Sequence, residues 1–188
     1  MTKRKIFEYG GVLAGFVLVA FGVVAIIMGV NGRTEVRDSL ARENIVGTPD
    51  SSIAGQKVDT GAEAKAFATT MRKHTLEATG GQTYAEMPRF LDENGKGTND
   101  EAAAATDPKT GEPVANGARN IWVTETALTT ALNMSYMAEQ LALFGIVVGF
   151  ALLLAGIGFI VLAVGGALRH RETEAAAPAR LKDTAVTA

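Results

Sequence analysis

The chain has 188 residues, of which 47% are hydrophobic, and its formal net charge is −2. This length fits one small unit and leaves no room for a large autonomous enzyme. The chain contains no cysteine, which excludes disulfide bonds, a thiol nucleophile and any lipid or haem attached through cysteine.

Two long apolar runs bracket a polar middle segment of 110 residues. Residues 10–30 and residues 141–168, which are 21 and 28 positions long, contain no Asp, Glu, Lys, Arg or His. About 20 helical residues cross a hydrocarbon core of about 30 Å, so each run is long enough to span a bilayer. A buried helix of a soluble protein rarely stays apolar on every face over such a length. We therefore expect an integral membrane protein with two transmembrane helices.

The first run is expected to be an uncleaved signal anchor. Lys3, Arg4 and Lys5 precede it, as in a signal peptide. A cleaved signal peptide, however, has an apolar stretch of about 7–15 residues and a small-x-small cleavage site. This run is longer, and no such site follows it.

The distribution of charge predicts the topology. Cationic residues close to a span favour the cytoplasmic side, and they occur in the N-terminal stub (residues 1–9) and in the tail (residues 169–188). The middle segment, residues 31–140, has 11 Lys and Arg against 16 Asp and Glu, and is long enough to be translocated regardless of charge. We expect a plasma-membrane protein with both termini cytoplasmic, a disordered tail and an extracytoplasmic middle segment.

The middle segment begins with a helix that continues out of the membrane through about residue 44, followed by a turn at residues 47–50. Two short extended pieces on either side of this turn, at residues 45–46 and 56–58, are predicted to pair. Thr60 and Glu63 then have the spacing of a capping box, which predicts a helix that ends near Thr79, before Gly80-Gly81. One face of this helix is weakly apolar: Ala64, Phe67, Ala68, Met71, Thr75 and Ala78.

Residues 92–117 are predicted to form a mobile loop, because they are rich in Gly, Pro, Asn and charged residues and offer little apolar surface to offset ordering. Asp92 opens a superficial match to a calcium-binding loop. Lys96 occupies a ligand position in that register and Ala103 replaces the required bidentate glutamate, so no calcium site is expected.

A single helix is predicted from about residue 119 to residue 168. Residues spaced by sevens along it form a stripe of mostly small side chains, and the first helix has a partner stripe. In a bilayer, small residues let helix backbones approach closely. We infer a packing seam in an antiparallel helical hairpin; the alternative is that the stripes face another subunit. The seam consists of Gly11, Gly15, Gly22 and Gly29 on the first helix and Ala142, Gly145, Gly149 and Gly156 on the second. Its continuation outside the bilayer runs through Ile121, Thr124, Leu128, Ala131 and Ser135.

The sequence offers few candidates for catalytic or metal-binding residues. His74 has no carboxylate or histidine at metal-ligand spacing on its helix, and His170 is predicted on the other side of the membrane. No nucleophile, phosphate-loop or paired-carboxylate motif occurs, so no catalytic residue, metal or cofactor is expected. Trp122 is predicted either to pack within the extracytoplasmic helix region or to contact a partner, and Phe67 and Met71 are further possible partner contacts.

The sequence resembles a family of uncharacterised actinobacterial two-span membrane proteins over most of its length outside residues 92–117. The glycine-rich second span and four short segments carry the resemblance: Glu43-Asn44-Ile45-Val46, Gly55-Gln56-Lys57-Val58, His74-Thr75-Leu76-Glu77-Ala78-Thr79-Gly80-Gly81 and Thr83-Tyr84-Ala85-Glu86-Met87. Some relatives bear the label of an aromatic ring-opening dioxygenase small subunit, which requires a metal site that these residues do not support. The resemblance therefore implies location and architecture without an activity.

Together these features predict a mainly α-helical protein: a transmembrane antiparallel hairpin with an extracytoplasmic helical stalk and a small irregular cap. We expect a non-enzymatic accessory or scaffold subunit of an envelope or respiratory complex. Its expected partners are the lipid bilayer and other membrane subunits or further copies of itself, with no nucleic acid. The alternative is an envelope sensor or ligand-binding module that uses residues 61–91.

Overall fold

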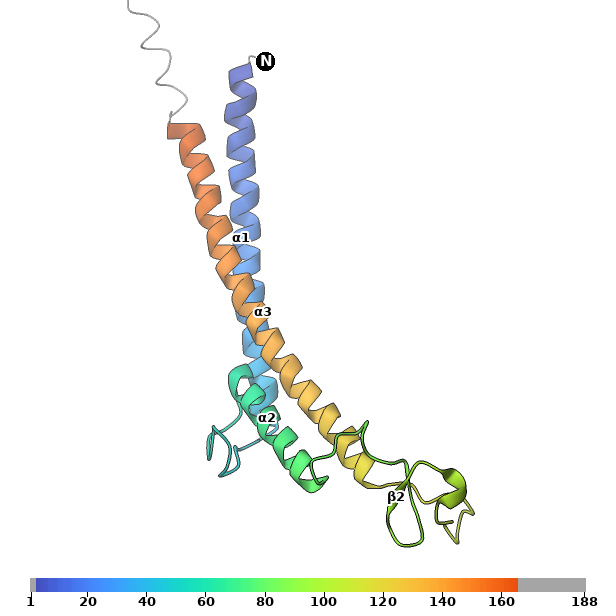
Figure 1. Ribbon diagram of the computed structural model, residues 1–188. Coiled ribbons are helices and arrows are strands. Elements are labelled where there is room, and N and C mark those ends of the chain that lie inside the picture. Colours follow the sequence, from blue (N-terminus) through green and yellow to red (C-terminus); the bar gives the residue numbers. More distant parts are fainter. Residues whose placement is uncertain (1–2, 166–188) are drawn as a thin grey trace, which may run out of the picture. The chain divides into compact units, whose positions relative to one another are not determined.

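The computed structural model describes residues 3–165, and among them three α-helices account for most of the fold (Figure 1). Helix α1 covers Lys3–Arg42, α2 covers Gly61–Ala78 and α3 covers Ala118–Gly165. A two-residue antiparallel pair, β1 (Phe90–Leu91) and β2 (Gly97–Thr98), and a 3-10 turn, η1 (Glu101–Ala103), lie between α2 and α3. The predicted tail at residues 169–188 lies outside the described residues.

The chain divides into two compact units. Unit 1 contains, of the described chain, residues 3–30 of α1 and residues 144–165 of α3; unit 2 is residues 31–143. The prediction of a mainly helical protein with two long apolar helices is confirmed. Both α1 and α3 are long and apolar enough to cross a membrane by length and composition.

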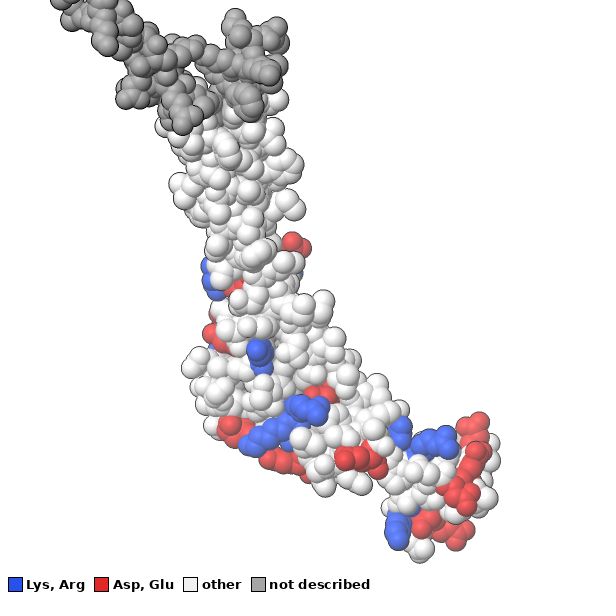
Figure 2. Space-filling view, turned by 45° about the horizontal axis from the view of Figure 1, so that its top comes forward, with Lys and Arg blue, Asp and Glu red and all other residues white. Residues whose placement is uncertain are grey.

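In unit 1, α1 and α3 run side by side in opposite directions (Figure 1). Many of their large apolar side chains are exposed, among them Phe16, Phe21, Phe150 and Leu154. In the most apolar 18-residue window of each helix only 11% is buried. Figure 2 shows this part of the surface without Lys, Arg, Asp or Glu, which gather on unit 2.

Unit 2 has a small core between the end of α1, the segment after it, α2 and the first half of α3. The buried members of this cluster are Leu40, Ile53, Val58, Ala64, Ala68 and Leu132. The predicted pairing across the turn is confirmed, because Val46 forms an antiparallel bridge with Lys57 and the Val58 N–H donates to the Ile45 carbonyl. This pairing carries Val58, which is 1% exposed, into the core.

Helix α2 begins and ends as the sequence predicts. The Thr60 hydroxyl accepts a hydrogen bond from the Glu63 N–H at 3.3 Å, and the Glu63 carboxylate accepts one from the Thr60 N–H at 2.9 Å. The helix ends at Ala78, where Gly80 and Gly81 take positive φ angles of 63° and 80° that side chains disfavour.

The segment predicted to be a mobile loop has more backbone pairing than the sequence suggests. The Leu91 N–H donates to Val114 and the Ala105 N–H donates to Leu91, so three short stretches lie next to one another. Asp92 and Asp107 accept hydrogen bonds from the backbone two residues ahead, and Gly95 and Gly111 supply turns with positive φ. Composition indicates only how much apolar surface a segment can bury. Local hydrogen bonds such as these can order a backbone segment that has no apolar core.

Candidate functional site

In unit 1, helices α1 and α3 pack against each other at glycine residues. A Cβ added at Gly22 would lie 2.6 Å from the Gly149 carbonyl oxygen, and one added at Gly149 would lie 2.7 Å from the Gly22 oxygen. Gly15 and Gly156 approach each other in the same way, at 2.7 and 2.6 Å. Each of these contacts meets backbone, which cannot rotate aside, so a side chain at any of the four positions would push the helices apart.

The other expected seam residues lie along the same two faces. Gly11 would place a Cβ 3.2 Å from that of Ala163, and Gly145 would place one 3.9 Å from the Ala25 oxygen. Gly29 is buried. In unit 2, Gly32 would place a Cβ 3.8 Å from that of Ala142. Within one chain, the structure therefore brings Gly15 and Gly22 of α1 against Gly156 and Gly149 of α3.

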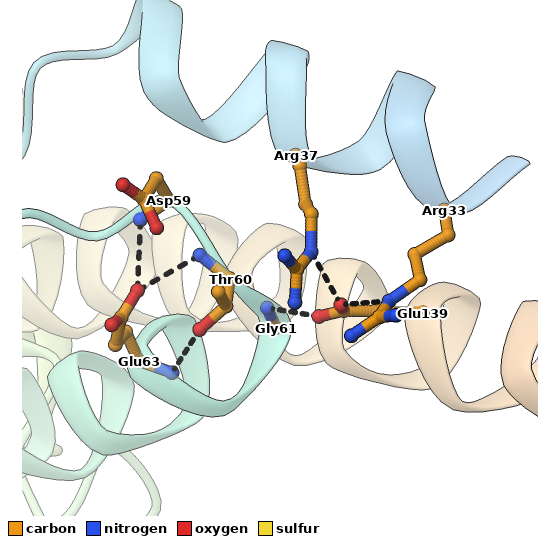
Figure 3. A network of polar contacts seen from close by, with 7 residues as sticks. All are labelled: Arg33, Arg37, Asp59, Thr60, Gly61, Glu63 and Glu139. Atoms are coloured by element: carbon orange, nitrogen blue, oxygen red, sulfur yellow. Dashed lines mark hydrogen bonds and ion pairs between the residues drawn. The ribbon is translucent and has the colours of Figure 1, made fainter. Parts of the chain in front are cut away.

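A polar junction in unit 2 joins all three helices through one carboxylate (Figure 3). Glu139 of α3 accepts hydrogen bonds on Oε1 from Arg33 Nε at 2.9 Å and Arg37 Nε at 2.7 Å, both from α1. Its other oxygen, Oε2, accepts from the Gly61 N–H at the start of α2, at 2.6 Å. The residue is 6% exposed. One buried charge thus fixes the position of three chain segments.

The contacts at this junction offset the unfavourable free energy of burying the Glu139 carboxylate. A lone carboxylate removed from water is strongly unfavourable, but here two guanidinium groups and a helix N-terminal N–H surround it. Arg33 and Arg37 are one helical turn apart and reach it from the same face of α1. Gly61 allows the close approach, because a Cβ there would lie 2.8 Å from Tyr136 Cα. Sequence patterns did not single out Glu139, although it lies about one helical turn from Ala142, which faces Gly32.

The capping box lies beside this junction (Figure 3). Burial raises the pKa of Glu63, but hydrogen bonds donated by the Asp59 and Thr60 N–H groups outweigh it, and the pKa lies below the ordinary value. Glu63 therefore stays ionised at neutral pH and keeps the start of α2 in place next to Gly61.

A second tie holds the far side of α2. Asp50, in the turn after α1, accepts from His74 Nε2 at 2.8 Å and from Lys73 Nζ at 3.0 Å. The hydrogen bonds with His74 and then Lys73 hold the pKa of Asp50 well below its usual range. His74 thus has an exposed carboxylate partner 24 residues away in the sequence. Residue spacing within α2 does not reveal this partner, because Asp50 lies outside that helix.

Trp122 belongs to the interior of unit 2. It is 3% exposed, its Nε1 donates to the Gln82 carbonyl at 2.9 Å, and Arg72 lies over its ring at 5.1 Å from the centroid. Of its two expected roles, packing within the helical region is the one that this geometry supports. Phe67 and Met71 lie elsewhere, on the rim of a groove.

That groove lies in unit 2 and consists of two adjoining hollows. One part, about 510 Å³, is lined by Phe67 and Met71 of α2, by the end of α1 and by one face of α3. An adjoining hollow of about 460 Å³ shares Met71 and Leu128 with the first and continues toward the start of α3. The walls are mostly apolar: Leu40, Ile45, Phe67, Met71, Ile121, Leu128 and Leu132.

The outer part of the expected seam lines this groove instead of packing against α1. Ile121 and Leu128 are 42% and 49% exposed, whereas Trp122, Glu125, Leu132 and Glu139 in the same half of α3 are buried. The reason is that α1 ends at Arg42, so the stripe on α3 extends beyond the helix that covers it.

The described residues 3–165 contain no group of three or more His, Asp and Glu side chains arranged to hold a metal ion. Asp92, which opens the superficial calcium-loop match, instead accepts backbone hydrogen bonds from Asn94 and Lys96. Comparison with protein-family models, curated proteins and solved structures found no match to this chain.

Proposed function

We propose that the protein is a non-enzymatic, two-span membrane protein that serves as an accessory or scaffold subunit of an envelope or respiratory complex. In this proposal residues 10–30 and 141–168 cross the plasma membrane as an antiparallel hairpin, and residues 31–140 lie outside as a helical stalk and cap. The resemblance to actinobacterial two-span proteins points to the same architecture.

The observation that carries the proposal is the surface of unit 1. A core helix of a soluble protein is mostly buried, whereas in unit 1 α1 and α3 leave most of their large apolar side chains exposed, and the buried residues among those described are glycines. Such a surface is stable where the solvent is lipid. The open groove of unit 2 supports the role of a subunit, because it offers apolar surface that the chain itself leaves uncovered.

Purification in mild detergent tests the role. We expect other membrane subunits to remain bound through size-exclusion chromatography, and a strictly solitary monomer would argue against an accessory subunit. Elemental analysis of the same sample checks the non-enzymatic part of the proposal, which a stoichiometric transition metal would contradict.

The proposed topology has an independent test. A reporter active only outside the cytoplasm, fused at Gly97 in β2, should be active, and fusions at either terminus should be inactive. Cytoplasmic reporter activity at Gly97 would overturn the arrangement.

A second candidate function is an envelope sensor or ligand-binding module in residues 61–91. The groove favours it, because Phe67 and Met71 of this region line it together with Leu128. Thermal unfolding of the full chain with and without envelope components distinguishes this function: a saturable rise in stability supports it, and Phe67→Ala should remove the rise.

A further inference from the structure

The groove of unit 2 follows the path of α1 beyond its end. Within this unit α1 lies against α3 at Gly32 and Ala142 and at Arg37 and Glu139, and Leu40 shares a core cluster with Leu132. Since α1 ends at Arg42, only a few residues after Leu40, the first turns of α3, from Ala118 onward, extend past the end of α1. The groove is therefore continuous with an interface that the chain already forms between two helices.

The floor of the groove has the spacing of a helix-packing surface. Of the eight residues of α3 that line it, five follow alternating separations of three and four: Ile121, Thr124, Leu128, Ala131 and Ser135. This is the stripe that packs against α1 further along the helix. Ala131, Ser135 and Ser39 at one end are small, which lets another backbone approach. At 1.5 Å per residue the stripe is about 21 Å long, the length of a helix of about 14 residues.

The acidic side chains that line the groove favour a basic binding partner over a second copy of this chain. Two carboxylates, Glu43 and Glu125, line it, and no Lys or Arg is among its lining residues. Glu125 is 5% exposed, and its hydrogen-bond partner is the hydroxyl of the adjacent Thr126 at 3.3 Å. A second copy docked groove to groove would bring four carboxylates together, which like-charge repulsion disfavours.

We propose that this groove binds an amphipathic helix of a different protein, with an apolar face at three- and four-residue spacing and Lys or Arg at its edges. The helix extends the path of α1 along α3, with Phe67 and Met71 of α2 at its side, and completes a four-helix arrangement in unit 2. Its cations pair with Glu43 and Glu125. This inference rests on the proposed role as a subunit and adds the chemistry of the partner.

Single cysteines test whether the groove is covered, because the natural chain has none. Leu128→Cys lies in the groove, and Val123→Cys is a matched control on another face of α3; the two residues are 49% and 57% exposed. In native membranes, membrane-permeant N-ethylmaleimide should modify Leu128→Cys at least about tenfold more slowly than Val123→Cys, as expected for a site packed under a partner. After purification in a detergent that removes partners, the two rates should become similar.

The outcomes separate this inference from the proposed function. Equal rates in native membranes overturn the inference, and if partner subunits still copurify, the role of a subunit stands. Protection of Leu128→Cys that persists in the purified chain, with disulfide-linked dimers on oxidation, indicates a second copy and also overturns it.

A photo-crosslinking residue at Ile121 tests the chemistry of the occupant. The expected adduct in native membranes is a peptide of another protein with apolar residues at helical spacing and flanking Lys or Arg. A lipid adduct, or a peptide without basic residues, contradicts the proposal. Glu43→Lys should lower the crosslinking yield at least about threefold. Glu35→Lys makes the same charge reversal on α1, outside the groove, and should leave the yield unchanged.

Discussion

Glu139 should be the most sensitive polar position in unit 2. In Glu139→Gln the shape is kept but the charge is lost. The remaining carbonyl oxygen still accepts from Arg33 and Arg37 when it faces them, but the amide NH₂ group then faces the Gly61 N–H, donor against donor. The substitution thus weakens two charge-assisted hydrogen bonds and abolishes a third, at 2.9, 2.7 and 2.6 Å.

The magnitude follows from burial. A hydrogen bond to a charged group contributes about 1.5–3 kcal/mol, and a neutral acceptor retains about half of that. Glu139 is buried, but the two arginine side chains are 42% and 40% exposed, so water compensates them in part. We expect Glu139→Gln to lower the free energy of unfolding by about 2–4 kcal/mol, below the combined contribution of the three bonds.

Trp122 provides the assay, because it is the only tryptophan and lies buried in unit 2. Its fluorescence during urea unfolding in a mild detergent reports the stability of this unit. Glu112→Gln makes the same chemical change at an exposed site of unit 2 whose side chain has no hydrogen bond or ion pair within the described chain, and it should change stability by less than about 0.5 kcal/mol.

A double-mutant cycle isolates the ion pair. Arg37→Gln should destabilise the natural chain more than it destabilises Glu139→Gln, with a coupling of about 0.5–3 kcal/mol. Equal stability of Glu139→Gln and Glu112→Gln, or additive effects in the cycle, would refute the view that Glu139 holds the three segments together.

Three further predictions concern the seam and the two ends of α2. Gly22→Ala should destabilise the helix pair of unit 1 by about 1–3 kcal/mol in thermal unfolding, because its Cβ meets backbone, whereas Gly158→Ala, with open space around it, should be neutral. Thr60→Ala should cost about 0.5–2 kcal/mol and increase hydrogen exchange in the first turn of α2; unchanged exchange would contradict the role of the cap. Since the pKa of Asp50 is lowered in the folded chain, its contribution is present above the unfolded pKa and is lost as pH falls through the folded value. The difference in stability between the natural chain and Asp50→Asn should thus be constant near neutral pH and shrink in acid, and a difference that grows in acid would disprove this assignment.

Local patterns predicted the elements of this protein well. The capping box and the glycine pair give both ends of α2, because a helix terminus is specified by residues within four positions of it. The turn at residues 47–50 also correctly indicated the pairing of Val46 with Lys57, because a turn brings the short segments on either side of it together. Composition did not predict the backbone pairing within residues 92–117, because an average over the segment does not register the local hydrogen bonds that Asp92 and Asp107 accept.

The candidate site could be predicted only in part. Spacing by sevens identified the face of α1 and the inner part of α3 that lie together, but it could not show where α1 stops covering α3. The extension of the stripe through Ile121 and Leu128 was therefore read as packed seam, whereas it is an open groove. The same spacing could not show that Trp122 is buried whereas Ile121 and Leu128 are exposed.

The sequence by itself determined the two long apolar helices and the boundaries of α2, because chain composition and nearest neighbours specify both. Only the tertiary structure decided which charges pair: Arg33 and Arg37 meet Glu139 across more than 100 positions, and Asp50 meets His74. It also decided that the apolar runs pack through Gly22 on Gly149 and Gly15 on Gly156, leaving their large side chains outside. The physical reason is that burial and ion pairing depend on which surfaces come within a few ångströms of each other, and sequence separation does not fix that distance.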